Sequence, residues 1–311
     1  MSINRREFLK KIYNAMVVAG ISSFISFDDL LAFDSGKYKK PNIVWLLGSS
    51  CSGCSTSLLT IDDIPFHELL LNIANVVLHP TISAATGDDV VHIMNTVIND
   101  MKEDYIFVLE GSVPTAMPHS CLFAGKPIMQ WIEPLMANAS AVVAAGTCAA
   151  FGGVTTMEAM VTGCKSASGF LEENNINKPL INLPNCPLKP EHMLYTLAHL
   201  ARLNKAPECD SEYRPLRFYA NTVHERCIYY SSFQEKTFAK QIGDNGCLFK
   251  LGCQGPITKN DCLINGSNGN TNTCIRAGHP CIGCAGEQFP RQIMMHSYDD
   301  TRSIRKFKFK G

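Results

Sequence analysis

The sequence Asn42-Ile43-Val44-Trp45-Leu46-Leu47 leads directly into Gly48-Ser49-Ser50-Cys51-Ser52-Gly53-Cys54. The first part is a short and almost continuous apolar run, which is typical of a strand buried on both faces of a parallel sheet. The second part is a loop of small residues that carries a Cys-x-x-Cys pair, and a helix is expected over residues 55–59. We therefore predict a strand that ends in a cysteine-bearing loop at the start of a helix.

The same alternation continues along the chain. Further strands are predicted at residues 105–110, 141–145 and 180–183, and helical periodicity is present between them, for example at residues 88–101 and 191–203. Strands that alternate with helices in this way are typical of an α/β fold. We predict an open, doubly wound parallel sheet of the flavodoxin-like kind in the N-terminal part of the chain.

Cysteines follow several of these strands. Cys51 and Cys54 come after residues 42–47, Cys148 after residues 141–145, and Cys186 after residues 180–183. Ligands of open α/β sheets bind beyond the carboxyl ends of the strands, so one edge of the fold can gather all four thiols. Cys51-x-x-Cys54 alone is also compatible with a thioredoxin-like redox pair or with zinc, but the two further cysteines favour a four-thiolate site.

Length, charge and hydropathy exclude several classes of protein. The chain has 311 residues, which suggests two domains. Its 28 basic and 28 acidic residues cancel, which argues against a general nucleic-acid-binding protein. With 46% hydrophobic residues it is not mainly disordered. It is not a polytopic membrane protein either, because it has no uninterrupted apolar run of about 18 residues.

The composition changes after Arg214. Long apolar periods end there, and seven of the 14 cysteines lie between Cys227 and Cys284. A segment this poor in regular structure needs something besides an apolar core to hold it, and metal ligation would supply that. We predict domains at residues 38–205 and 211–311, the second mostly irregular. Disulfides, zinc and iron–sulfur clusters compete as explanations for the cysteines.

The C-terminal part offers two sets of four ligands. The first set is His224-x-x-Cys227 together with Cys247 and Cys253, and a histidine three residues before a cysteine is a spacing common to metal sites. The second set contains only cysteines, namely Cys262, Cys274, Cys281 and Cys284.

The N-terminus has the features of an export signal. Arg5-Arg6 is followed by Phe8-Leu9-Lys10 and by a modest apolar stretch over residues 12–27, which resembles a twin-arginine signal peptide over residues 1–35. An ordinary basic amphipathic helix is the alternative. A twin-arginine signal implies export of a folded protein to the periplasm or to the outer face of the cytoplasmic membrane. No C-terminal membrane anchor is expected in this chain, which stops at Gly311.

Seven segments jointly carry a family resemblance. They occupy residues 48–55, 109–115, 146–153, 184–191, 214–219, 251–258 and 277–284. In this order they are similar to the small, electron-transferring subunit of nickel–iron uptake hydrogenases. The resemblance implies three iron–sulfur clusters, and it gives the iron–sulfur explanation preference over disulfides and zinc.

The resemblance also implies how the ligands are divided. A proximal 4Fe–4S cluster would be held by Cys51, Cys54, Cys148 and Cys186, and a distal 4Fe–4S cluster by His224, Cys227, Cys247 and Cys253. The medial cluster between them would be held by Cys262, Cys281 and Cys284. Many family members carry proline at the place of Cys274 and hold a 3Fe–4S medial cluster. We expect Cys274 to be the fourth ligand of a 4Fe–4S cluster, with a free, buried thiol as the alternative.

Glu110 occupies a family position close to the proximal cluster. It is either a proton-transfer residue or a helix-capping or salt-bridged carboxylate.

The implied function is an electron relay within an oxidoreductase. Hydrogen would be oxidised at nickel–iron in a separate large subunit, and electrons would pass through the three clusters to a cytochrome or a quinone-linked acceptor. Two alternatives are a hydrogen-sensing regulatory subunit and an exported structural protein that binds zinc or forms disulfides. No nucleic-acid partner is expected.

Overall fold

The protein is described here by a computed structural model, which places residues 40–60, 74–156, 161–267 and 271–290. The predicted signal peptide and the C-terminal residues 307–311 lie outside the described residues. Within the described part of the chain, none of the helices combines the length and the apolar character needed to cross a membrane.

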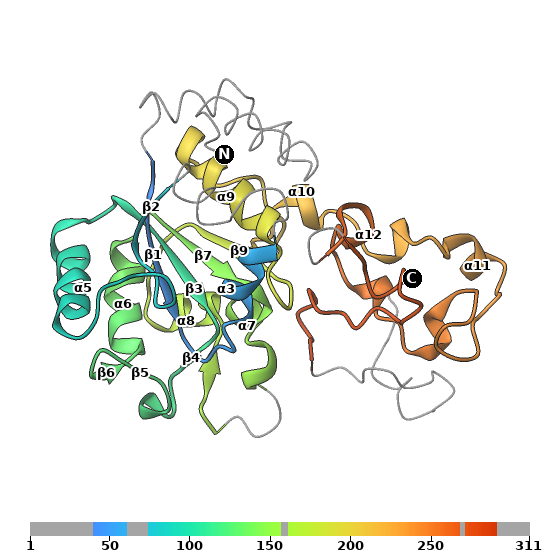
Figure 1. The fold of residues 1–311 in the computed structure, drawn as a ribbon, viewed down its shortest axis with the longest axis horizontal. Coiled ribbons are helices and arrows are strands. Elements are labelled where there is room, and N and C mark those ends of the chain that lie inside the picture. The colour runs from blue at the N-terminus through green and yellow to red at the C-terminus, as the bar shows by residue number, and fades with distance from the viewer. Residues whose placement is uncertain (1–39, 61–73, 157–160, 268–270, 291–311) are drawn as a thin grey trace, which may run out of the picture.

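A parallel sheet forms the centre of the N-terminal part (Figure 1). Its strands are β1 (Asn42–Leu47), β2 (Asn75–Leu78), β3 (Tyr105–Glu110), β7 (Ala141–Ala145) and β9 (Leu180–Leu183). The spatial order is β2-β1-β3-β7-β9, so the strands in chain order are arranged 2-1-3-4-5, which is the flavodoxin-like order. Four of the strands have the predicted bounds. The edge strand β2 was not predicted.

Helices cover both faces of this sheet. They are α3 (Gly53–Ser57), α5 (Asp88–Asp100), α6 (Met129–Asn138), α7 (Gly146–Phe151), α8 (Ala167–Glu173) and α9 (Pro190–Leu203). Val44 and Leu46 of β1 pack with α5, α6 and α8, whereas Ile43 and Trp45 pack with α9. Successive side chains of a strand point to opposite faces, so one apolar strand contributes to both cores.

Two short antiparallel strand pairs form separate two-stranded sheets. Val113–Pro114 (β4) pairs with Cys164–Lys165 (β8), and Leu122–Phe123 (β5) pairs with Lys126–Pro127 (β6).

The C-terminal part is built from short elements beside this sheet (Figure 1). Its helices are α10 (Leu216–Tyr219), α11 (Tyr230–Gln234) and α12 (Cys262–Asn265), with 3-10 turns at His224–Arg226, Leu248–Leu251 and Gly255–Ile257. Its apolar cluster is small and contains Cys253 and Cys281 among its buried residues. Among the described residues after 211, the chain is mostly irregular, as predicted.

Polar contacts join the two parts. Asn185 accepts a hydrogen bond from Asn260 at 2.8 Å, and the hydroxyl of Thr147 donates to the carbonyl oxygen of Cys284. Lys189, just before α9, forms a buried ion pair with Asp261, just before α12. The cysteines after the strands and those near the chain end are thereby brought next to one another.

Candidate functional site

The loop after β1 is held by a carboxylate from β3. Glu110 is 1% exposed and accepts hydrogen bonds from the backbone N–H groups of Cys54 (3.2 Å) and Ser55 (3.1 Å). It also accepts from Ser50 Oγ, Ser55 Oγ and the indole N–H of Trp45. These backbone donors belong to the first turn of α3 and have no partner within the helix. The helix-capping interpretation of Glu110 is therefore what the contacts show, and α3 begins at Gly53, two residues before the predicted helix.

The strand ends bring four cysteines to one edge. Cys148 lies in α7, immediately after β7, and Cys186 follows β9. The backbone N–H of Thr147 donates to the carbonyl oxygen of Asn185 at 3.1 Å, which ties these two loops together. The N–H of Leu188 donates to Cys54 Sγ at 3.4 Å, which ties the last loop to the first. Cys51 and Cys186 are exposed, so this edge faces outward.

The thiols at this edge are close enough to influence one another's ionisation. Burial and, after it, the negative charges of Cys148, Cys284 and Cys51 raise the pKa of Cys186 to about 12. Burial also raises the pKa of Cys54, with the Glu110 carboxylate as the next cause. Thiols in this setting do not form thiolates together unless a cationic centre such as a metal binds them.

Glycine allows the backbone to approach these sulfur atoms. Gly146, between β7 and Cys148, has a φ of +84°, and a Cβ atom there would collide with Cys54 Sγ. Glycine is therefore required at position 146, because any side chain there would displace the sulfur atom of Cys54. A four-thiolate edge with this close backbone approach fits an iron–sulfur cluster, whose ligands are thiolates and whose sulfur atoms accept backbone hydrogen bonds.

The predicted distal ligands line one small pocket. His224, Cys227, Cys247 and Cys253 all contribute to its wall, together with Ile275 and residues of the 3-10 turns. The His224 ring packs edge-on against Phe233, with 4.5 Å between the ring centroids. Burial lowers the pKa of His224 despite the nearby Glu225 carboxylate. The imidazole is therefore neutral near pH 7, as a metal ligand must be.

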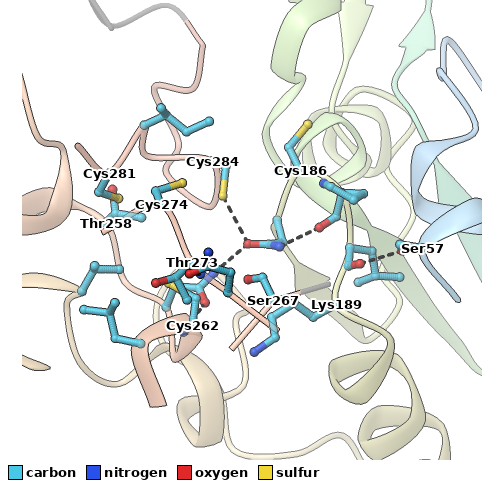
Figure 2. Close-up of a pocket in the computed structure, with 18 of the residues that line it drawn as sticks. Ser57, Cys186, Lys189, Thr258, Cys262, Ser267, Thr273, Cys274, Cys281 and Cys284 are labelled. Carbon is cyan, nitrogen blue, oxygen red and sulfur yellow. Dashed lines mark hydrogen bonds between the residues drawn. The ribbon is translucent and has the colours of Figure 1, made fainter. Parts of the chain in front are cut away.

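The predicted medial ligands line a larger cavity between the two parts of the chain. Cys262, Cys274, Cys281 and Cys284 surround a space of about 320 Å³, with Cys186 on the opposite side (Figure 2). The charge of Cys274 raises the pKa values of both Cys262 and Cys284, for which burial is the main cause. Cys274 thus lies with the other three cysteines, although it is exposed to solvent at its outer side.

All fourteen cysteines lie within the described residues and are free thiols. The disulfide alternative is therefore wrong for this structure. No three histidine, cysteine, aspartate or glutamate side chains of the described residues converge on a single-ion site. Ligands of a cluster differ from ligands of one ion, because each thiolate binds its own iron atom. Cys121, Cys164 and Cys209 line neither of the two cysteine cavities.

Some residues at these sites were not singled out by the sequence analysis. Lys189 lies in the cavity wall and pairs with Asp261, which also contacts His192 at 3.0 Å. Asn185 accepts from Cys284 Sγ at 3.4 Å, and it precedes Cys186. The only signal for Lys189 and Asn185 in the sequence was their place in the segment 184–191, next to a predicted ligand.

Known proteins resemble the chain over nearly its whole length. The family model for the C-terminal part of the NiFe/NiFeSe hydrogenase small subunit matches residues 219–297, and the one described as "NADH ubiquinone oxidoreductase, 20 Kd subunit" matches residues 51–200. The small subunit of the periplasmic [NiFeSe] hydrogenase of Desulfomicrobium baculatum is 33% identical, over 93% of this chain and 97% of that protein. The chain belongs to the small subunits of nickel–iron hydrogenases.

Further small subunits show the same relationship. The Hydrogenase-2 small chain of Escherichia coli K12 is 32% identical over 92% of this chain and 77% of its own length. The quinone-reactive Ni/Fe-hydrogenase small chain of Wolinella succinogenes is 30% identical over 92% and 81%. The solved structure of the reduced, active Ni-Fe-Se hydrogenase of D. baculatum matches with a TM-score of 0.76 and 34% identity, over 81% of this chain and 97% of that chain.

Membership in this family settles the class of activity. A hydrogenase small subunit is one part of a heterodimeric oxidoreductase that acts on hydrogen, and its partner is a large subunit. The prediction of the family, of the enzyme class and of a parallel α/β sheet is confirmed.

Proposed function

We propose that this chain relays electrons between the hydrogen-oxidising large subunit and an external acceptor through three iron–sulfur clusters. The observation that carries the proposal is the sorting of twelve predicted ligands into three places. One set gathers at the sheet edge, and the other two line two separate spaces, the larger of which Cys186 of the first set also borders. When bound, the clusters would supply one-electron carriers. The chain's own residues hold them, space them and set their surroundings.

The proximal ligands would be Cys51, Cys54, Cys148 and Cys186. Two of them are exposed on the outward edge of the sheet, which is where a large subunit would have to dock to pass electrons in. Glu110 orients the loop of Cys54 through hydrogen bonds to its backbone. A proton-transfer role of Glu110 stays a prediction, and its present contacts account for the carboxylate without it.

The medial ligands would be Cys262, Cys274, Cys281 and Cys284. Cys274 lines the same cavity as the other three and raises the pKa values of Cys262 and Cys284, which supports four protein ligands and a 4Fe–4S cluster. With only three thiolates the site would suit a 3Fe–4S cluster.

The distal ligands would be His224, Cys227, Cys247 and Cys253. His224 and Cys227 are half-buried, and the neighbouring Ile228 is 57% exposed, so this end reaches the surface. We place the exit of electrons here, toward a cytochrome or a quinone-linked partner. The quinone-reactive enzyme of W. succinogenes is one relative that supports such an acceptor. Periplasmic relatives support export to the periplasm or to the outer face of the cytoplasmic membrane.

The test is an EPR redox titration of the anaerobically purified complex, combined with iron, sulfide, zinc and nickel analysis. We expect signals of reduced 4Fe–4S clusters, iron and sulfide in the amounts of three clusters, and a nickel-containing partner. A zinc-containing, colourless protein would overturn the proposal in favour of an exported structural protein. Clusters in a complex that regulates gene expression but does not feed electrons to an acceptor would instead indicate a hydrogen sensor.

A further inference from the structure

A buried cation lies in the wall of the medial cavity. The side chain of Lys189 is 3% exposed, and its residue lines the space that Cys262, Cys274, Cys281 and Cys284 surround (Figure 2). Its ammonium group donates to Asp261 Oδ1 at 2.9 Å. Buried ammonium groups are rare without a partner, because their desolvation is costly.

The two residues of the ion pair line different cavities. Lys189 lines the medial cavity, whereas Asp261 lines a different cavity together with Arg217, Arg226 and Asn265. The Asp261 carboxylate is held there by His192 at 3.0 Å and by the amide of Asn265 at 2.7 Å. Of the two members of the pair, Lys189 therefore lines the cavity that the thiols surround, and Asp261 does not.

Water screens the charge of Lys189 little. The side chain of Lys189 is 3% exposed and that of Asp261 is 7% exposed, so the ion pair lies in a region of low dielectric.

We propose that Lys189 raises the reduction potential of the medial cluster. Reduction adds one electron to the cluster, and a fixed cation within a low-dielectric wall stabilises the added negative charge. The inference rests on the proposed function, because it requires a cluster held by the four cysteines. Lys189 is a positioning residue in this proposal and not a catalytic one. It acts on electron transfer by placing a charge, while its pairing with Asp261 also joins the two parts of the chain.

A second charged residue in the same cavity wall allows the sign of the effect to be tested. Glu191 is 8% exposed and lines the same cavity, with the opposite charge. If charge at this wall sets the potential, neutralising Lys189 and neutralising Glu191 must shift it in opposite directions. Damage to the packing of the cavity would not produce opposite signs.

The experiment is an EPR-monitored redox titration of the intact complex carrying Lys189→Met, Lys189→Arg or Glu191→Gln. Lys189→Met leaves the Asp261 carboxylate without its cation, so we expect the equilibrium constant for medial-cluster reduction to fall about tenfold, a shift of 59 mV for one electron. Lys189→Arg keeps the charge and is expected to keep the potential. Glu191→Gln is expected to raise it.

Lys259→Met is the matched control. Lys259 also pairs with an aspartate, Asp210, but its side chain is 37% exposed, and it does not line the medial cavity. We expect no shift of the medial potential in this variant.

Two results would overturn the inference. One is an unchanged medial potential in Lys189→Met, and the other is a shift of the same sign in Lys189→Met and Glu191→Gln. Should Lys189→Met not assemble, Lys189→Gln, whose neutral amide can still donate to Asp261, takes its place with the same expected shift. The absence of any medial cluster in the wild-type complex would instead contradict the proposed function.

Discussion

The carboxylate of Glu110 accepts a hydrogen bond from the backbone N–H of Cys54, with 3.2 Å between oxygen and nitrogen. Glu110 ends β3, and Cys54 lies in the first turn of α3, which follows β1. β1 and β3 are neighbours at the point where the order of the strands reverses, and such points are the usual binding crevices of doubly wound sheets. The hydrogen bond thus holds Cys54, a proposed cluster ligand, at the crevice between β1 and β3.

Replacing Glu110 tests this capping role. Glu110→Ala leaves the buried donors of Cys54, Ser55 and Trp45 without an acceptor, and each unpaired group costs about 1–3 kcal/mol. We expect a lower melting temperature and less iron per complex, with a smaller loss in Glu110→Gln, which keeps one accepting oxygen. Glu133→Ala, at an exposed position of α6, is the control. Normal stability and iron content in Glu110→Ala would contradict the role.

Replacing Cys274 tests its proposed role as the fourth ligand of the medial cluster. Cys274→Ala takes away one of the four thiolates that surround the medial cavity. We expect the 3Fe–4S signal in EPR spectra of the oxidised complex and a loss of one iron atom per complex, because the fourth iron then has no protein ligand. Cys209→Ala removes a half-buried thiol outside the two cysteine cavities and serves as the control. A medial cluster that keeps four irons in Cys274→Ala would show that Cys274 is not a ligand.

Gly146 tests the close approach of the backbone to sulfur. Gly146→Ala meets both an unfavourable φ of +84° and a collision with Cys54 Sγ. Gly125→Ala has a similar φ of +78° with nothing within 4 Å of its added Cβ, so it measures the backbone strain alone, of order 1–3 kcal/mol. We expect Gly146→Ala to lose the proximal cluster signal and Gly125→Ala to retain it. Equal behaviour of the two variants would mean that the contact with sulfur is unimportant.

Burial of His79 is expected to make the free energy of unfolding depend on pH. The residue is 2% exposed, it lies 3.3 Å from Ser55 Oγ, and burial lowers its pKa from 6.5 to about 4. Between these values the unfolded chain binds a proton that the folded chain does not, so stability decreases as the pH falls through this window. The slope from this residue approaches about 1.4 kcal/mol per pH unit.

The measurement for His79 is thermal unfolding of the complex between pH 7 and pH 5. We expect the melting temperature of His79→Asn to depend less on pH than that of the wild type. His119→Asn, at an exposed histidine, is expected to follow the wild type. A pH dependence that is identical in all three proteins would exclude His79 as its source.

Local sequence patterns were sufficient to predict most strands of the sheet. The apolar runs of β1, β3, β7 and β9 predicted the observed strands, because buried parallel strands need continuous apolar sequence bounded by loops. β2 was missed since it is a four-residue edge strand with only partial burial, and so it carries little apolar signal. The start of α3 was misplaced because its first backbone donors are capped by Glu110, 55 or more positions away in the chain.

The sequence by itself determined the family, the alternation of strands and helices, and the candidate ligands, since these depend on residue types at short spacings. Only the tertiary structure decided what surrounds those ligands. Lys189 and Asp261 are 72 positions apart, and their pairing exists because the C-terminal part docks against the start of α9. Periodicity and motifs encode local conformation, whereas the charge beside a distant thiol depends on how two separate parts of the chain pack together.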